Sequence, residues 1–156
     1  AHDCENAEQC FATTLDLLAD TFQGLNRYEQ AEEAGLRSLR IKQNCESFSK
    51  ADVLRAMLKL SKIYYAQSKL GAAAYTTNHV LQLSEQTLGF GHPAVGFVAQ
   101  QLADLYTALG SLKEADLLYQ RAYRLQRKQF ASQAEISWYS SSSSTSSSSS
   151  SERACA

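Results

Sequence analysis

The fold is decided by residues 102–125, which read LADLYTALGSLKEADLLYQRAYRL. Apolar residues recur three or four positions apart on both sides of Gly110, which is the spacing of helices with one buried face. Glycine readily takes the left-handed conformation that closes a helix, so the first helix is expected to end at Gly110. In the second half, Ala115 and Ala122 are small enough to let two helix backbones approach closely. The stretch therefore predicts two antiparallel helices joined by a short turn.

The same pattern occurs twice more, at a constant spacing of 42 residues and without a gap. Residues 18–41 read LADTFQGLNRYEQAEEAGLRSLRI, and residues 60–83 read LSKIYYAQSKLGAAAYTTNHVLQL. The register aligns Leu18 with Leu60 and Leu102, Phe22 with Tyr64 and Tyr106, Ala31 with Ala73 and Ala115, and Ile41 with Leu83 and Leu125. Self-similarity at a fixed period is the signature of a repeat protein, so three copies of the helix pair are expected.

Six helices follow from this repeat, near residues 8–24, 28–46, 50–67, 71–88, 93–109 and 112–130. Pro93 suits the first turn of the fifth helix, where its missing N–H costs nothing. Antiparallel pairs with short connections stack into a right-handed superhelical solenoid. We therefore predict an all-α solenoid over residues 1–133.

Residues 134–156 are expected to form a serine-rich tail. All residues of 140–151 are serine except Thr145, and such a tract cannot supply the core of a fourth pair. The outer face of the third pair, with Tyr119 and Tyr123, then needs another cover. Either another chain supplies it, or a fold-back of the tail does, through Ile136, Trp138 and Tyr139.

Composition narrows the possible functions. The 156 residues are 44% hydrophobic and 20% charged, with a net charge of −1, which argues against nucleic-acid binding. No apolar run approaches the ~20 residues of a membrane span. The four cysteines are isolated and contain no CxxC pair, as in reduced intracellular proteins, so a cytoplasmic location is expected. The three histidines share no ligand spacing with cysteine, so no metal or other cofactor is expected.

Residues 102–125 resemble a tetratricopeptide repeat. The seven signature positions are filled by Leu102, Ala103, Tyr106, Gly110, Ala115, Tyr119 and Ala122. The earlier copies depart from the signature at Asn26, Gly35 and Ser38, and at Ser68, Thr77 and Val80. The 42-residue unit and the opening GFGHPAV at residues 89–95 are similar to kinesin-light-chain-type repeats. The resemblance covers roughly residues 10–130. It implies a helical scaffold without catalysis that binds peptides or other proteins, often within larger assemblies.

In this family the first helix of each pair lines a concave groove. The resemblance therefore gives the candidate partner-binding residues as Asp16, Asp20, Arg55, Lys59, Lys62, Tyr65, Gln100, Gln101 and Asp104. Arg55, Lys59 and Lys62 share one helix face beside Tyr65, which predicts an acidic or aromatic-acidic peptide ligand. The alternative is an ordinary solvated helix face. The Asn-Asn pair typical of kinesin-light-chain repeats is replaced by Gln100-Gln101 in the third copy.

Three functions stay open at this stage, and none is catalytic in this chain, because no nucleophile–base pair is recognisable. The first is a scaffold or adaptor that binds a protein segment in the groove. The second is a structural subunit of a large multiprotein assembly, and the third is a regulatory repeat segment of a larger enzyme. Residues 1–46 carry a net charge of −5, whereas residues 47–88 carry +3 and residues 89–130 carry +2. Such a dipolar solenoid could self-associate head to tail.

Overall fold

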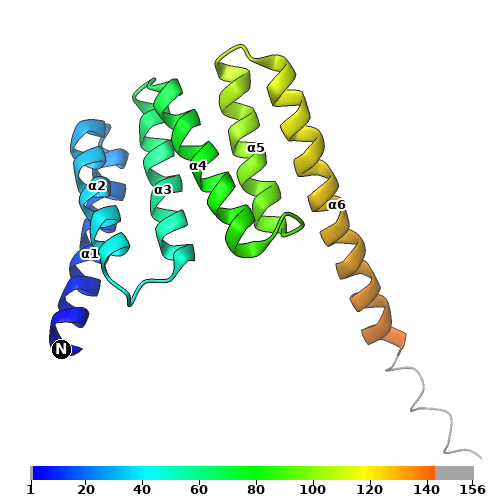
Figure 1. The fold of residues 1–156 in the computed structure, drawn as a ribbon, viewed down its shortest axis with the longest axis horizontal. Coiled ribbons are helices and arrows are strands. Elements are labelled where there is room, and N and C mark those ends of the chain that lie inside the picture. The colour runs from blue at the N-terminus through cyan, green and yellow to red at the C-terminus, as the bar shows by residue number, and fades with distance from the viewer. Residues whose placement is uncertain (1, 143–156) are drawn as a thin grey trace, which may run out of the picture.

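The computed structural model describes the backbone of residues 2–142, which is entirely helical apart from short turns. The six helices are α1 (His2–Gly24), α2 (Tyr28–Asn44), α3 (Lys50–Ala66), α4 (Leu70–Leu88), α5 (Pro93–Ala108) and α6 (Leu112–Ser142). Each helix packs chiefly against its neighbours in the sequence, and the most extensive contacts are α1 with α2, α3 with α4, and α5 with α6. Figure 1 shows the three antiparallel pairs standing side by side along the long axis of the molecule.

The turn inside each pair has the same backbone in all three copies. Asn26, Ser68 and Gly110 lie 42 residues apart in the sequence, and their φ angles are 59°, 61° and 83°. The N–H of the following residue donates to the carbonyl oxygen five residues earlier, at 2.8 Å in the first turn and 2.9 Å in the other two. This bond belongs to the Schellman closure of a helix. Asparagine and serine therefore take the left-handed position that glycine takes in the third copy, and the repeat is intact at these departures.

Small side chains lie where the two helices of a pair come closest. Ala31, Ala73 and Ala115 are all buried, as their common register requires. Larger apolar residues fill the space between successive pairs, and Leu60 and Leu102 are almost fully buried there. The two clusters that span α2–α3 and α3–α6 are built from these positions, so the repeat register is also the packing register.

The first helices of the second and third pairs begin at side-chain caps. Ser49 and Asp52 form a reciprocal capping box at the start of α3. At α5, the Nδ1 atom of His92 accepts a hydrogen bond from the N–H of Ala94, and Pro93 occupies the first turn as expected. These caps satisfy backbone donors that would otherwise lack partners and define where the two helices start.

The last helix is longer than the apolar pattern indicated. The expected end lay at residue 130, but α6 continues to Ser142, so residues 134–142 of the expected serine-rich tail are helical. No glycine or proline occurs between Leu112 and Ser142, and serine alone does not stop a helix. Likewise α1 begins at His2 rather than near residue 8. At both places the helix outlasts its packing partner.

Of the two alternatives for covering the third pair, the fold-back does not occur at Ile136. This residue continues straight along α6 and is exposed, and the side chains of Tyr119 and Tyr123 are also exposed. Figure 1 shows α6 at one end of the row of helices, extending past the others. The side chains of Trp138 and Tyr139 and the serine tract from residue 143 lie outside the described residues. Nothing within residues 6–137 covers the outer face of α6.

Candidate functional site

A hollow of about 530 Å³ lies where the first helices of the three pairs face one another. We call it the groove. Side chains from α1, α3 and α5 surround it, and α4 contributes to its floor. Its lining consists of Gln23, Ser61, Lys62, Tyr65, Ala66, Thr77, Gln101, Asp104 and Leu105. Four of the residues expected to bind a partner are therefore brought together: Lys62, Tyr65, Gln101 and Asp104.

The floor of the groove is made of hydroxyl groups that bond to one another. Ser61 Oγ and Thr77 Oγ1 are buried and lie 2.5 Å apart. The carbonyl oxygen of Ala73 lies 3.1 Å from the first and 2.9 Å from the second, so it can accept from either. Since their hydrogen bonds are made within the chain, these groups give the groove its shape rather than a binding function.

The rim carries polar side chains that are available to a ligand. Lys62 and Tyr65 come from α3, one turn apart, and Gln101 comes from α5. Within residues 6–137, none of these three side chains forms a hydrogen bond or an ion pair. Tyr65 is 54% exposed although it lines the groove, so its ring is accessible to a ligand. These three side chains offer one cation, one aromatic ring and one amide, and Gln23 lines the groove with a second amide from α1.

Asp104, on the same rim, is held by the last helix. The Tyr119 hydroxyl on α6 donates a short hydrogen bond to the Asp104 carboxylate. This bond favours the neutral phenol and raises the pKa of Tyr119 above its ordinary value. Asp104 is consequently fixed on the α6 side of the groove and adds a negative charge opposite Lys62.

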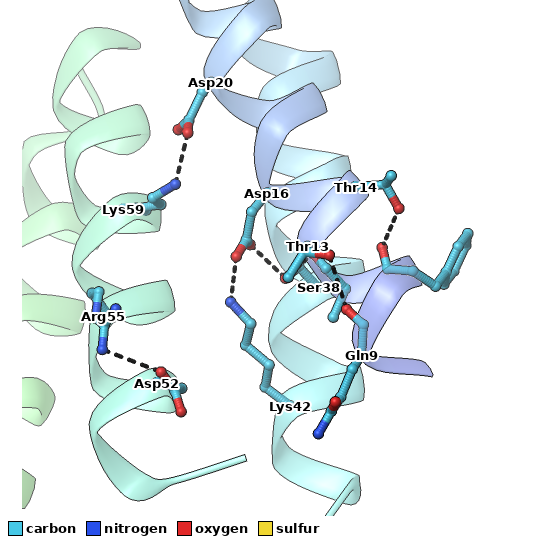
Figure 2. A network of polar contacts seen from close by, with 12 residues as sticks. Gln9, Thr13, Thr14, Asp16, Asp20, Ser38, Lys42, Asp52, Arg55 and Lys59 are labelled. Atoms are coloured by element: carbon cyan, nitrogen blue, oxygen red, sulfur yellow. Dashed lines mark hydrogen bonds and ion pairs between the residues drawn. The ribbon is translucent and has the colours of Figure 1, made fainter. Parts of the chain in front are cut away.

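Two of the three expected basic residues are paired within the chain, as Figure 2 shows. Lys59 Nζ lies 2.7 Å from the carboxylate of Asp20, which joins α1 to α3. The Arg55 guanidinium lies 3.2 Å from Asp52. The Ser49 hydroxyl donates to Asp52 at 2.6 Å and holds the pKa of that carboxyl below its usual range. The predicted basic face is thus reduced to Lys62.

Asp16 and Gln100 do not line the groove. Each bonds to the residue 26 positions later, on the second helix of its own pair. Asp16 forms a short ion pair with Lys42, whose side chain is only 8% exposed, and it accepts from Ser38 Oγ at 2.5 Å. Gln126 Nε2 donates to Gln100 Oε1 at 2.9 Å. Figure 2 shows Asp16 between Ser38 and Lys42. In the first and third copies this register position therefore bonds to the partner helix, and the groove of about 530 Å³ is lined without Asp16 and Gln100.

The groove floor was not predicted from the sequence. Ser61 stands where the first and third copies have alanine, and Thr77 stands where the third copy has a tyrosine. Two hydroxyl residues at positions that are otherwise small or aromatic were a usable signal. They lie on different helices of one pair, so their contact could have been predicted from the register.

The described residues contain neither a candidate metal site nor a membrane-spanning helix. No cluster of three His, Cys, Asp or Glu side chains suited to a metal ion occurs there. None of the helices between residues 2 and 142 has the length and apolar character needed to cross a bilayer.

The arrangement of helices is that of tetratricopeptide-like repeat proteins. BtubC (BKLC) from P. vanneervenii is 18% identical, with a TM-score of 0.66 over 73% of this chain and 45% of that one. A putative kinesin light chain from Podosopora anserina is 22% identical, with a TM-score of 0.66 over 75% of this chain and 55% of that one. The TPR domain of Arabidopsis FLU is 19% identical, with a TM-score of 0.67 over 78% of this chain and 98% of that one.

These likenesses establish the fold, which is all-helical and tetratricopeptide-like. The chain spans about half the length of the BtubC and kinesin-light-chain structures. No family model matches the sequence, and no curated protein matches it. The kinesin-light-chain resemblance of the 42-residue unit is thus supported by shape.

Proposed function

We propose that this chain is a non-catalytic interaction module that binds an extended segment of a partner protein in the groove. The observation that carries the proposal is the rim itself. Within residues 6–137, Lys62, Tyr65 and Gln101 have no side-chain partner and face one open hollow, while the neighbouring Arg55 and Lys59 form ion pairs. Polar side chains without a partner inside the protein can orient a bound segment, and an exposed aromatic ring beside them can anchor it.

The rim chemistry narrows the ligand. Lys62 favours a carboxylate, and the Gln101 amide can both donate to and accept from a peptide backbone. The ring of Tyr65 offers apolar area to a neighbouring side chain. Asp104 repels a second carboxylate on the α6 side. The expected ligand is therefore a segment with one acidic residue beside an apolar or aromatic one, rather than a polyacidic tract.

Selection from a displayed random-peptide library, followed by measured dissociation constants, tests this proposal. We expect Lys62→Glu to weaken the selected peptides at least about tenfold, and Tyr65→Ala to weaken them several-fold. Lys113→Glu on α6 and Tyr75→Ala on α4 are matched controls, because both side chains are exposed away from the groove. Peptides that bind equally well to Lys62→Glu and to Lys113→Glu would contradict the proposal.

A structural role in a larger assembly is the second candidate. It is favoured by the exposed apolar side chains on α1 and α6, at the two ends of the row of helices. A cytoplasmic setting fits either role, because Cys10 on α1 and Cys45 just after α2 are free thiols. If the chain is instead a regulatory repeat segment of a larger enzyme, which is the third possible function, it would bind its partner through the same groove.

A further inference from the structure

Within the chain, the second helix of one pair always packs against the first helix of the next pair. On the second helices, Leu39 and Leu81 occupy one register position at this junction. Leu81 is 5% exposed and belongs to the central cluster, and Leu39 packs against the same cluster. Tyr123 stands at the same position on α6 and is 65% exposed. The last helix thus carries a junction position that no helix covers within residues 6–137.

The first helix carries the other half of the same junction, and there too the apolar position is exposed. Leu60 and Leu102 are 2% and 1% exposed, because each is covered by the preceding second helix. Leu18 stands at that register position on α1 and is 46% exposed. Similarly, Val95 is fully buried, whereas its equivalent Phe11 is exposed. The chain therefore displays both halves of its own internal junction, one at each end.

The two surfaces can be defined by their exposed apolar residues. The α1 end face consists of Phe11, Leu18 and Leu25, which recur every seven residues. The α6 end face consists of Leu112, Tyr123 and Phe130, which lie on one side of the helix away from α5. Three large apolar side chains on one side of a helix are a candidate for an interaction surface.

We infer that copies of this chain associate head to tail, with the α6 end face of one copy against the α1 end face of the next. The contact would continue the internal α2–α3 and α4–α5 junctions into a second molecule. Charge favours this orientation, since residues 1–46 carry −5 and residues 89–130 carry +2. Each copy keeps one free face of each kind, so the association extends beyond a dimer.

The junction between copies has Tyr123 in place of Leu39 and Leu81, and Phe11 in place of Val95. It also differs from the internal α2–α3 junction at the register position of Gly35. Gly35 lies so close to Leu60 that an added Cβ would be 2.9 Å from Leu60 Cδ2. Tyr119 stands at the same register position on α6, but its hydroxyl is drawn toward Asp104 at the groove. In the proposed contact the copies meet along Tyr123 and Phe130, which are 65% and 69% exposed.

Complementary variants of the full chain test this inference. Tyr123→Glu/Phe130→Glu disables the α6 end face, and Phe11→Glu/Leu25→Glu disables the α1 end face. All four side chains are more than half exposed, so the fold should survive, which circular dichroism would verify. Leu117→Glu and Leu17→Glu are controls, because they place the same charge on other sides of α6 and α1.

Sedimentation velocity over a wide range of protein concentration provides the readout. We expect the wild type and both controls to grow beyond a dimer as concentration rises, and each double variant alone to stay monomeric. An equimolar mixture of the two double variants should form a one-to-one dimer and nothing larger, because only one intact junction is possible. A monomeric wild type would overturn the inference. A dimer of the Phe11→Glu/Leu25→Glu variant alone would also overturn it, by revealing a symmetric α6–α6 contact.

Discussion

The concave side of the molecule has two halves that use the same register positions differently. On the α1 side, the charged residues are paired within the chain: Asp16 with Lys42 on α2, Asp20 with Lys59 on α3, and Arg55 with Asp52 inside α3. Between α3 and α5, the corresponding rim is open, and Lys62 and Gln101 have no partner within residues 6–137. Both halves come from one repeated backbone. The repeated backbone thus determines which positions face the hollow, and pairing between side chains determines which of these residues are available to a ligand.

The closed half should be the stabilising one, and the largest expected effect lies at its buried ion pair. Replacing Lys42 with alanine leaves the carboxylate of Asp16 without its cation in a largely buried place. We expect the free energy of unfolding to fall by about 2–3 kcal/mol. Gln126→Ala changes the equivalent position in the open half, where the bond joins two exposed amides, and should cost less than about 0.5 kcal/mol. Urea unfolding measures both, and equal losses would show that the two halves do not differ.

The groove floor is the next test, because it belongs to the open half yet is fully bonded. Thr77→Val removes a buried hydroxyl and leaves Ser61 with only the Ala73 carbonyl, so we expect a loss of about 1 kcal/mol. The neighbouring Thr76→Val removes a hydroxyl that bonds only within its own helix, to Ala72. Thermal unfolding should separate the two variants. A lower melting temperature for Thr76→Val would contradict the described floor.

Opening the closed half should extend the binding surface at little cost. Asp20→Asn releases Lys59 from a solvent-exposed ion pair, which is worth less than about 0.5 kcal/mol. Lys59 would then add to Lys62 a second cation, one turn away on α3, without a partner within residues 6–137. Peptides with one acidic residue should bind about two- to threefold more tightly at low salt, and the gain should vanish at high salt. Weaker binding by Asp20→Asn would contradict the idea that pairing blocks this half.

The smallest effect concerns the pH dependence of the joint between the first and second pairs. Burial raises the pKa of Glu32, but hydrogen bonds from Gln67 and Lys69 outweigh it and leave the pKa below its ordinary value. A carboxyl with a depressed pKa in the folded state stabilises the protein above its unfolded pKa, and this stability is lost as pH falls through the folded pKa.

Glu32→Gln should therefore flatten the decline of stability between about pH 5 and pH 3 by a few tenths of a kcal/mol. Denaturant titrations at a series of pH values measure this slope. An unchanged slope would mean that Glu32 does not contribute to the joint.

Much of the fold could be predicted from the sequence, because the repeat register carries it. Ala31, Ala73 and Ala115 are buried together, and Asn26 and Ser68 share the left-handed turn of Gly110 although they break the glycine signature. Periodicity fails only where packing ends. Beyond residue 130, α6 has no partner to impose an apolar pattern, so its true end at Ser142 could not be inferred from such a pattern.

The candidate site could be predicted only in part, for a different reason. The register places a residue on a helix face, but it does not say which side chain finds a partner. Asp16 was expected to face the groove, yet Lys42 and Ser38 draw it to α2, and these residues are distant in the sequence. Lys59 and Lys62 look equivalent in the sequence, and only the position of Asp20 distinguishes them.

The most direct test of the account compares these two lysines, one turn apart on α3. The dissociation constant of a groove-selected peptide would be measured for Lys62→Glu and Lys59→Glu, with circular dichroism to confirm that both fold. Because Lys62 has no partner within residues 6–137 and Lys59 is already paired with Asp20, we predict at least about tenfold weaker binding for Lys62→Glu and less than about threefold for Lys59→Glu. Equal losses, or a larger loss for Lys59→Glu, would contradict the central claim that pairing within the chain decides where this solenoid binds.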